Sequence, residues 1–338
     1  MKDGKFLTLG IESSCDETAA AVLADGRQVL SNVISTQIEI HKQYGGVVPE
    51  IASRHHLTNV NRVIEQALNE ANVTMDQIDL VGVTYGPGLV GALVIGIAAA
   101  KAVSFATDTP LVGVNHMYGH VSSNFITYPE LEPPFISLVV SGGHTNIIEM
   151  EDYTSCNVIG ATRDDAAGEA YDKVARVIGL GYPGGPKIDK LAREGNPDAI
   201  KFKRVWLEKD SYDFSFSGLK TSVLNYVNHC KQKGIEINRA DVAAGFQEAA
   251  VEVLVEKSVK CAKEKGYGNL VLAGGVGANS RLRQALQQRC NEEGIKLYVP
   301  DRGLCTDNAA MIAVAAYYKY KAHGEDNLYL DADPGLSF

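Results

Sequence analysis

Two histidines, His116 and His120, lie four residues apart in the segment VGVNHMYGHVSSN, residues 112–124. On a helix this spacing places both imidazoles on one face, where they can bind one metal ion. Zinc proteases of the H-E-x-x-H type use the same spacing but add a glutamate as general base. Met117 occupies the glutamate position here. The pair therefore predicts a metal site that lacks the base of a protease.

Two histidines are too few ligands for a metal ion, and a carboxylate is expected as the third. Asp307 in GLCTDNAAMIA is the favoured residue, because it follows a predicted strand and begins the last predicted helix. Two alternatives are that Asp307 only caps this helix and that Cys305 is a softer ligand. The predicted metal site consists of His116, His120 and Asp307.

The elements that must position these residues follow an α/β pattern in two halves. Three extended segments, FLTLGIE, TAAAVLA and QVLSNVI, precede a helix at about 57–71. The strand IDLVGVTYG, the helix GALVIGIAAAKAVSFAT and the strand PLVGVNH come next. PFISLVVSGGHTNIIEM then repeats the strand, polar turn and strand of the first half. Parallel strands joined by helices predict two covered sheets, so the expected fold class is α/β.

This order is typical of the actin-like ATPase architecture, in which two duplicated RNase H-like domains surround a nucleotide cleft. The predicted domains are residues 1–131 and 132–338, and the last helix, about 307–324, could pack back on the first domain. In this class each domain opens with a hairpin whose polar turn faces the cleft. The turns 12–18 and 141–145 would then hold phosphates through backbone N–H groups, with a plain hairpin turn as the alternative.

Two glycine-rich segments favour different interpretations. GPGLVG at 86–91 matches the dinucleotide motif G-x-G-x-x-G. It follows the fourth strand rather than the first, so we interpret it as a tight strand-to-helix turn. In LAGGVGANSRLR at 272–283, small residues let a flat base or sugar approach the backbone, and Asn279 offers donors and acceptors. The actin-like class binds adenosine here, so this segment predicts a nucleoside site.

The composition disfavours several protein classes. The six cysteines form no C-x-x-C pair, which predicts free thiols in a reducing cytoplasm. The longest apolar segment contains Lys101 and predicts a buried helix rather than a membrane span. A net charge of −9 disfavours nonspecific nucleic-acid binding by the whole surface. Local basic patches at 201–209 and 54–56 remain possible, although a solvated surface is the simpler interpretation.

A set of short segments is similar to the TsaD/Kae family. They are GIESSCDET, GGVVPEIASRHH, YGPGLVGAL, NHMYGH, VVSGGHT, GEAYDKVAR, GYPGGPKID, FSFSGLK, AGGVGANSRLR and CTDNAAMIA. The resemblance runs from about residue 7 to residue 320, and SSCDET resembles the bacterial branch. Members are tRNA N6-adenosine threonylcarbamoyltransferases, once catalogued as O-sialoglycoprotein endopeptidases.

The resemblance implies transfer of a threonylcarbamoyl group from threonylcarbamoyl-adenylate to N6 of an adenosine. That adenosine lies 3′ of the anticodon in tRNAs that read ANN codons, and AMP is released. One divalent metal ion, iron or zinc, is implied at His116, His120 and Asp307, and no catalytic base is assigned. ATP or ADP could occupy the place of the adenylate. The implied substrate contacts are Val139, Val140, Ser141, Gly142, Gly143, Asp172, Gly185, Asp189 and Asn279.

The family also implies partners besides tRNA. These are a TsaB-like paralogue, a TsaE-like ATPase and a TsaC-type enzyme that makes the adenylate, all in the cytoplasm and without a membrane. Two other functions stay open. A metalloprotease rests on the histidine pair alone, and the missing glutamate argues against it. A sugar kinase or actin-like ATPase would share the fold, but such proteins use carboxylates with magnesium rather than a histidine pair.

Overall fold

The computed structural model describes residues 4–338, which divide into two compact units. Unit 1 comprises the residues up to Pro133, Glu151–Cys156 and Pro300–Phe338, and unit 2 comprises Pro134–Met150 and Asn157–Val299. The sequence-based boundary instead placed all of 132–338 in the second domain, with the last helix able to pack back. That difference arises because Pro300–Phe338 makes its contacts with the strands of unit 1, which lie far away in the sequence.

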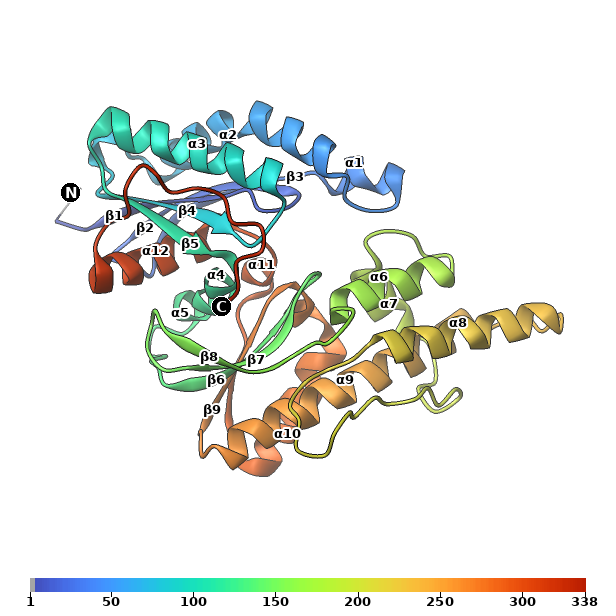
Figure 1. Cartoon of the computed structure of the whole chain (residues 1–338). Helices are drawn as coiled ribbons and strands as arrows, with labels where there is room; N and C mark the ends of the chain where they lie inside the picture. Colours follow the sequence, from blue (N-terminus) through green and yellow to red (C-terminus); the bar gives the residue numbers. More distant parts are fainter. Residues whose placement is uncertain (1–3) are drawn as a thin grey trace. The chain divides into compact units, whose positions relative to one another are not determined.

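The sheet of unit 1 has five strands in the order β3-β2-β1-β4-β5 (Figure 1). They are β1 (Leu7–Glu12), β2 (Glu17–Ala24), β3 (Gln28–Thr36), β4 (Leu80–Gly86) and β5 (Leu111–Asn115). The first three strands are antiparallel, while β1, β4 and β5 run parallel. Asp25 and Gly26 have φ angles of 51° and 74°, which suit the predicted tight turn between β2 and β3.

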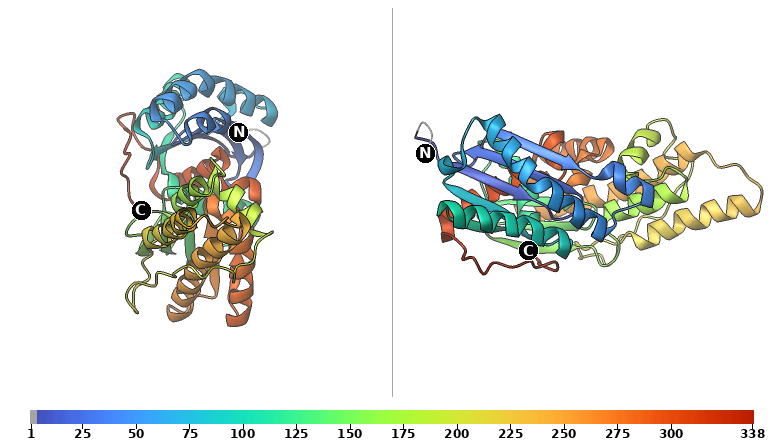
Figure 2. Two further views of the ribbon diagram at one scale, coloured as in Figure 1. Left: turned by 90° about the vertical axis from the view of Figure 1, so that its right-hand side faces the viewer. Right: turned by 90° about the horizontal axis from the view of Figure 1, so that it is seen from above.

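Two long helices cover one face of this sheet, α2 (Pro49–Ala71) and α3 (Val90–Thr107) (Figure 2, right). Leu7, Leu9 and Ile11 of β1 are buried in the same core cluster as side chains from both helices. Among the described residues, α3 is the one helix whose length and composition could span a membrane. It packs on α2 and β4 within unit 1, but only 33% of its residues are buried, so the predicted buried helix covers the sheet with one face and leaves Val90, Val94 and Phe105 exposed.

The other face of the sheet is covered by α12 (Ala309–His323). Side chains that alternate with the first set face this helix, and Leu80 and Val112 pack against Ile312. Gly10 makes a very close approach possible, because a Cβ atom there would lie 2.3 Å from the carbonyl oxygen of Ala309. The start of α12 is therefore held tightly against β1. Shorter helices complete unit 1: α1 (Ile38–His41), α4 (His116–Ser122), α5 (Asn124–Thr127) and α11 (Arg302–Cys305).

Unit 2 repeats the arrangement of unit 1 around its own sheet, in the order β10-β9-β6-β7-β8. Its strands are β6 (Phe135–Val140), β7 (Thr145–Met150), β8 (Cys156–Ala161), β9 (Asn269–Ala273) and β10 (Lys296–Tyr298). β6 pairs antiparallel with β7 and parallel with β9, as β1 pairs with β2 and β4. This correspondence supports the predicted duplication. The helices are α6 (Ala167–Val177), α7 (Gly184–Ala192), α8 (Ser217–Gln232), α9 (Arg239–Glu264) and α10 (Ser280–Glu293).

Candidate active site

The histidine pair lies on the short helix α4, which begins directly after β5. The predicted strand reached His116, but β5 ends one residue earlier, because Asn115 caps α4. Its side-chain oxygen accepts the backbone N–H of Met117 at 2.8 Å. The rings of His116 and His120 share one face, with centroids 4.6 Å apart. Met117 is buried, with 2% of its surface exposed.

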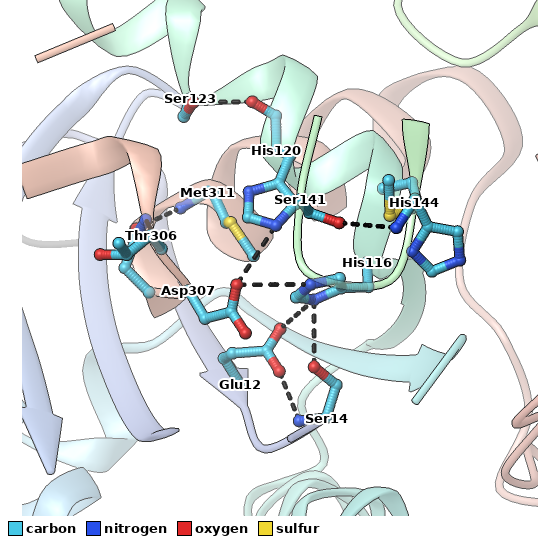
Figure 3. A network of polar contacts seen from close by, with 12 residues as sticks. Glu12, Ser14, His116, His120, Ser123, Ser141, His144, Thr306, Asp307 and Met311 are labelled. Carbon is cyan, nitrogen blue, oxygen red and sulfur yellow. Dashed lines mark hydrogen bonds and ion pairs between the residues drawn. The ribbon is translucent and has the colours of Figure 1, made fainter. Parts of the chain in front are cut away.

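Asp307 joins the two histidines from the other end of the chain (Figure 3). Its Oδ1 lies 3.5 Å from Nε2 of His116 and 3.2 Å from Nε2 of His120. One ligand atom from each of the three residues lies within 4.8 Å of the others, so the group could hold a metal ion. Asp307 does not cap α12, since Asn308 accepts the N–H of Met311 at 3.0 Å.

The thiol of Cys305 contacts two backbone carbonyl groups rather than the histidine pair. It lies 3.7 Å from the carbonyl oxygen of Pro300 and 3.6 Å from that of Asp301. Cys305 is fully buried and is absent from the metal-type group formed among residues 4–338. The alternative in which this sulfur replaces the carboxylate therefore has no geometric support.

The burial of His120 fits a cation at this place. The side chain is 1% exposed, and within residues 4–338 neither ring nitrogen makes a hydrogen bond. The approach of Nε2 to Asp307 is an ion-pair contact that lacks the geometry of a hydrogen bond. Buried polar atoms without partners are uncommon and costly. Two imidazole nitrogens and one carboxylate oxygen are suitable ligands for zinc or iron, so the residues fit the expected group.

Glu12 also belongs to this cluster, and the sequence reasoning missed it. It ends β1, is fully buried, and its Oε2 lies 3.0 Å from Nδ1 of His116 (Figure 3). Oε2 also accepts the hydroxyl of Thr84 at 2.6 Å, and Oε1 accepts the N–H of Ser14 at 2.5 Å. A charged residue at the end of the apolar strand LTLGIE was the available signal.

The charges of this cluster act together on three pKa values. Burial would lower the pKa of His116, but the charges of Glu12 and Asp307 outweigh burial and raise it. Burial would raise the pKa of both carboxyl groups, whereas the imidazolium of His116 lowers them. Glu17 differs, because burial together with the negative charges of Asp307 and Asp16 raises its pKa to about 10. Two carboxylates around one histidine therefore give this side-chain cluster a net negative charge, which favours a cation.

The expected phosphate turn of unit 2 follows directly after β6. Val139 and Val140 are the last two residues of that strand and are fully buried, so any contact they make with a substrate comes from a strand end. The turn itself begins at Ser141, whose N–H donates to the carbonyl of His144 at 2.8 Å. A Cβ atom added at Gly142 or Gly143 would meet no atom within 4 Å. These two glycines thus leave open space beside the turn.

The other predicted substrate residues lie in or beside three helices of unit 2: Asp172 in the middle of α6, Gly185 and Asp189 in α7, and Asn279 directly before α10. Asp172 on α6 accepts the N–H of Gly184 at 2.7 Å, which places Gly185 in the first turn of α7. Asp189 accepts the hydroxyl of Ser280 at 2.8 Å and thereby links α7 to α10. These two contacts join the middle of α6 to the start of α7, and α7 to the start of α10.

Asn279 caps α10 and donates to Gln247 at 2.7 Å. The segment before it lies beside the end of β6, because a Cβ at Gly274 would lie 2.4 Å from the carbonyl oxygen of Val140. Asn279 therefore has a structural role in addition to any contact with a ligand. In unit 1, the segment 86–91 is a strand-to-helix turn from β4 to α3, as interpreted from its sequence.

A comparison with known protein families matches residues 28–314 to "TsaD: tRNA N6-adenosine threonylcarbamoyltransferase". The chain belongs to the TsaD family. It is 58% identical to a tRNA N6-adenosine threonylcarbamoyltransferase of Clostridium botulinum (strain 657 / Type Ba4), over 97% of this chain and 96% of that protein. A relative of the same name from Clostridium perfringens (strain ATCC 13124) is 56% identical over 98% of both chains.

Two solved structures with the same fold are much more distant in sequence from this TsaD chain. Full-length HypF in its phosphate- and nucleotide-bound form superposes with a TM-score of 0.67 at 16% identity, covering 95% of this chain and 47% of HypF. Component A of the (R)-2-hydroxyglutaryl-CoA dehydratase of Acidaminococcus fermentans gives a TM-score of 0.56 at 17% identity, covering 94% of this chain and 99% of that chain. These likenesses confirm the predicted actin-like fold.

Proposed function

We propose that this chain transfers the threonylcarbamoyl group of threonylcarbamoyl-adenylate to N6 of the adenosine 3′ of the anticodon in tRNAs that read ANN codons. The observation that carries the proposal is identity of 58% to a tRNA N6-adenosine threonylcarbamoyltransferase over 97% of the chain. The group of His116, His120 and Asp307 supports it, since these residues were expected from the same family motifs.

In this reaction the N6 amine attacks the carbamoyl carbon, and a C–N bond replaces the C–O bond to the phosphate of AMP. The phosphate leaves with the electron pair, and the amine loses one proton. When bound at His116, His120 and Asp307, a divalent zinc or iron ion would supply Lewis-acid chemistry toward carbonyl or phosphate oxygens. No side chain is assigned as general base.

The role of unit 2 in the proposal is to bind the adenylate. Backbone N–H groups of Gly142 and Gly143 would face the phosphate, because open space adjoins both glycines, while the N–H of Ser141 donates within the turn to His144. Helices α6 and α7 and the start of α10, which hydrogen bonds of Asp172 and Asp189 join to one another, would contact the ribose and base through Asp172, Gly185, Asp189 and Asn279. A carboxylate such as Asp172 can orient ribose hydroxyls by charge-assisted hydrogen bonds. ATP or ADP would bind in the same place.

The proposal includes partner proteins in the cytoplasm. A chain with a net charge of −9 has limited attraction for tRNA on its own. A TsaB-like paralogue and a TsaE-like ATPase would assist it, and a TsaC-type enzyme would supply the adenylate. A metalloprotease is not favoured, because Met117 is buried and holds the position of the missing glutamate. A sugar kinase or ATPase is not favoured by the family match over 28–314.

The test is reconstitution of the reaction. Purified protein, the partner proteins, threonylcarbamoyl-adenylate and unmodified tRNA are incubated, and the nucleosides are analysed by mass spectrometry. Modified adenosine should form with wild type and disappear with His116→Ala, which should also lose metal by elemental analysis. His323→Ala is the matched control, because His323 contacts Thr154 rather than the metal-type group. Absence of product from metal-loaded wild type would contradict the proposal.

A further inference from the structure

Glu12 is a charged member of the cluster around His116 to which the proposed function assigns no role. It is fully buried at the end of β1, yet its two oxygens have three partners on different segments. Ser14 follows it in the first hairpin turn, Thr84 belongs to β4, and His116 begins α4. Burying a carboxylate costs free energy unless its oxygens accept hydrogen bonds or pair with a positive charge. The burial of Glu12 therefore needs an explanation.

The hydrogen bonds of Glu12 determine which nitrogen of His116 carries the proton. An ionised carboxylate only accepts hydrogen bonds, and Ser14 and Thr84 already donate to it. The 3.0 Å contact with His116 then requires a hydrogen on Nδ1, and the hydroxyl oxygen of Ser14, 3.2 Å from the same nitrogen, can accept from it as well. In the neutral ring this leaves Nε2 with a lone pair, and Nε2 is the nitrogen that lies 3.5 Å from Asp307.

We propose that Glu12 is a positioning residue for the metal site, which holds the Nδ1–H of His116 and keeps its Nε2 available as a ligand beside His120 and Asp307. The inference rests on the proposed function only for the presence of the metal. Metal-bound histidines commonly donate their second N–H to a carboxylate, which orients the ring and makes the nitrogen more basic.

Charge supports the same assignment. Two neutral imidazoles with the carboxylates of Glu12 and Asp307 carry two negative charges, which balance one divalent cation. Without the charge of Glu12, the buried site would hold a net positive charge when loaded. Both the orientation of His116 and the charge balance therefore predict weaker metal binding when Glu12 is neutralised.

The mutational test measures binding of zinc alone, by competition with a chromophoric chelator. Glu12→Gln keeps the shape of the side chain but removes its charge and places an amide NH₂ among hydrogen-bond donors. We expect zinc affinity to fall about 10- to 100-fold, the usual effect of losing such a partner. Thr84→Val is the matched control, because it removes a donor to the same oxygen but leaves the contact with His116, and it should change affinity about threefold or less.

A second measurement uses wild type and does not depend on the folding of a variant. NMR of the zinc-loaded protein with ¹⁵N-labelled histidine should show His116 with hydrogen on Nδ1 and metal on Nε2. A proton on Nε2, or unchanged zinc affinity in folded Glu12→Gln, would overturn the proposal. If wild type binds no zinc while transferring the group normally, the positioning role fails and the transferase function stands. If wild type binds zinc normally but forms no modified adenosine, the positioning role stands and the proposed function fails.

Discussion

Asn308 caps helix α12, and its neighbour Asp307 instead directs its carboxylate toward two histidines of α4. From the sequence, Asp307 could have capped the helix or bound a metal ion. In the structure Asn308 caps the helix and Asp307 faces the histidines. Because the cap is supplied by Asn308, the position of Asp307 at the start of α12 is fixed without using its own oxygens. Each role can therefore be removed separately.

Asp307→Asn should lower zinc affinity by at least about tenfold, because a neutral amide replaces the one anionic ligand. Asn308→Ala should leave zinc bound but lower the free energy of unfolding by about 1 kcal/mol, since one helix cap is lost. Elemental analysis and urea unfolding measure the two effects. Equal loss of metal in both variants would contradict this division of roles.

The close contact between β1 and α12 should make Gly10 intolerant of any side chain. In Gly10→Ala the new Cβ would lie 2.3 Å from a backbone oxygen, which cannot move aside as a flexible side chain can. We expect the unfolding free energy to fall by about 1–3 kcal/mol, as for other overpacked cores. Gly303→Ala is the control, since its Cβ would meet nothing within 4 Å. If the two variants unfold at the same urea concentration, the packing interpretation is wrong.

An added methyl group in the turn after β6 should leave the stability of the protein unchanged but lower its transferase activity. Gly143→Ala places a Cβ in open space and should change the unfolding free energy by less than about 0.5 kcal/mol. If the turn binds the adenylate phosphate, the methyl group should lower kcat/KM about tenfold, which corresponds to about 1.4 kcal/mol. Steady-state kinetics with threonylcarbamoyl-adenylate measure this. Normal kinetics in Gly143→Ala would remove support for a phosphate role.

Stability should decrease as the pH falls below about 6.5, partly because of His56. The side chain is fully buried, with contacts of 2.8 Å to Thr18 and 2.9 Å to the carbonyl of Cys15. Burial lowers the pKa of His56, so the unfolded chain takes up a proton that the folded protein resists. The stabilisation is therefore present above the unfolded pKa and lost as pH falls through and below it.

The measurement is urea unfolding between pH 5 and 7.5 in the presence of a chelator, so that metal release does not contribute. His56→Gln is the comparison, because glutamine keeps a donor and an acceptor but does not titrate there. Its unfolding free energy should change less steeply with pH than that of wild type, and each pKa unit of difference corresponds to about 1.4 kcal/mol. Parallel curves for the two proteins would show that His56 does not contribute.

Much of the fold was predictable because periodicity is local. The apolar runs in LTLGIE and ETAAAVLA and the Asp25–Gly26 turn led directly to the strands β1, β2 and β3. The start of α2 was placed eight residues late, at Leu57 instead of Pro49, because Arg54, His55 and His56 have the character of a polar surface. His56 is in fact fully buried, and its hydrogen bonds to the first hairpin come from residues 38 and 41 positions away.

The metal-type group was predictable because histidine and aspartate are common metal ligands. A pair of histidines at helical spacing has few other uses, and the structure brings Asp307 to them. Glu12 was missed because a lone glutamate is common, and only the fold shows that it is buried beside His116. Val139 and Val140 were implied as substrate contacts by the family motif, which does not distinguish the last residues of β6 from the turn that follows.

The order of the ligands along the chain has a consequence for biosynthesis. His120 and Asp307 are separated by 187 positions (307 − 120), so a ribosome makes both histidines long before the carboxylate that completes the set. α12 follows this carboxylate and docks on β1 only after synthesis has passed residue 309. Metal uptake is therefore expected to be a late event in maturation, and a prematurely terminated chain would be distinguishable from the finished enzyme by its lack of metal.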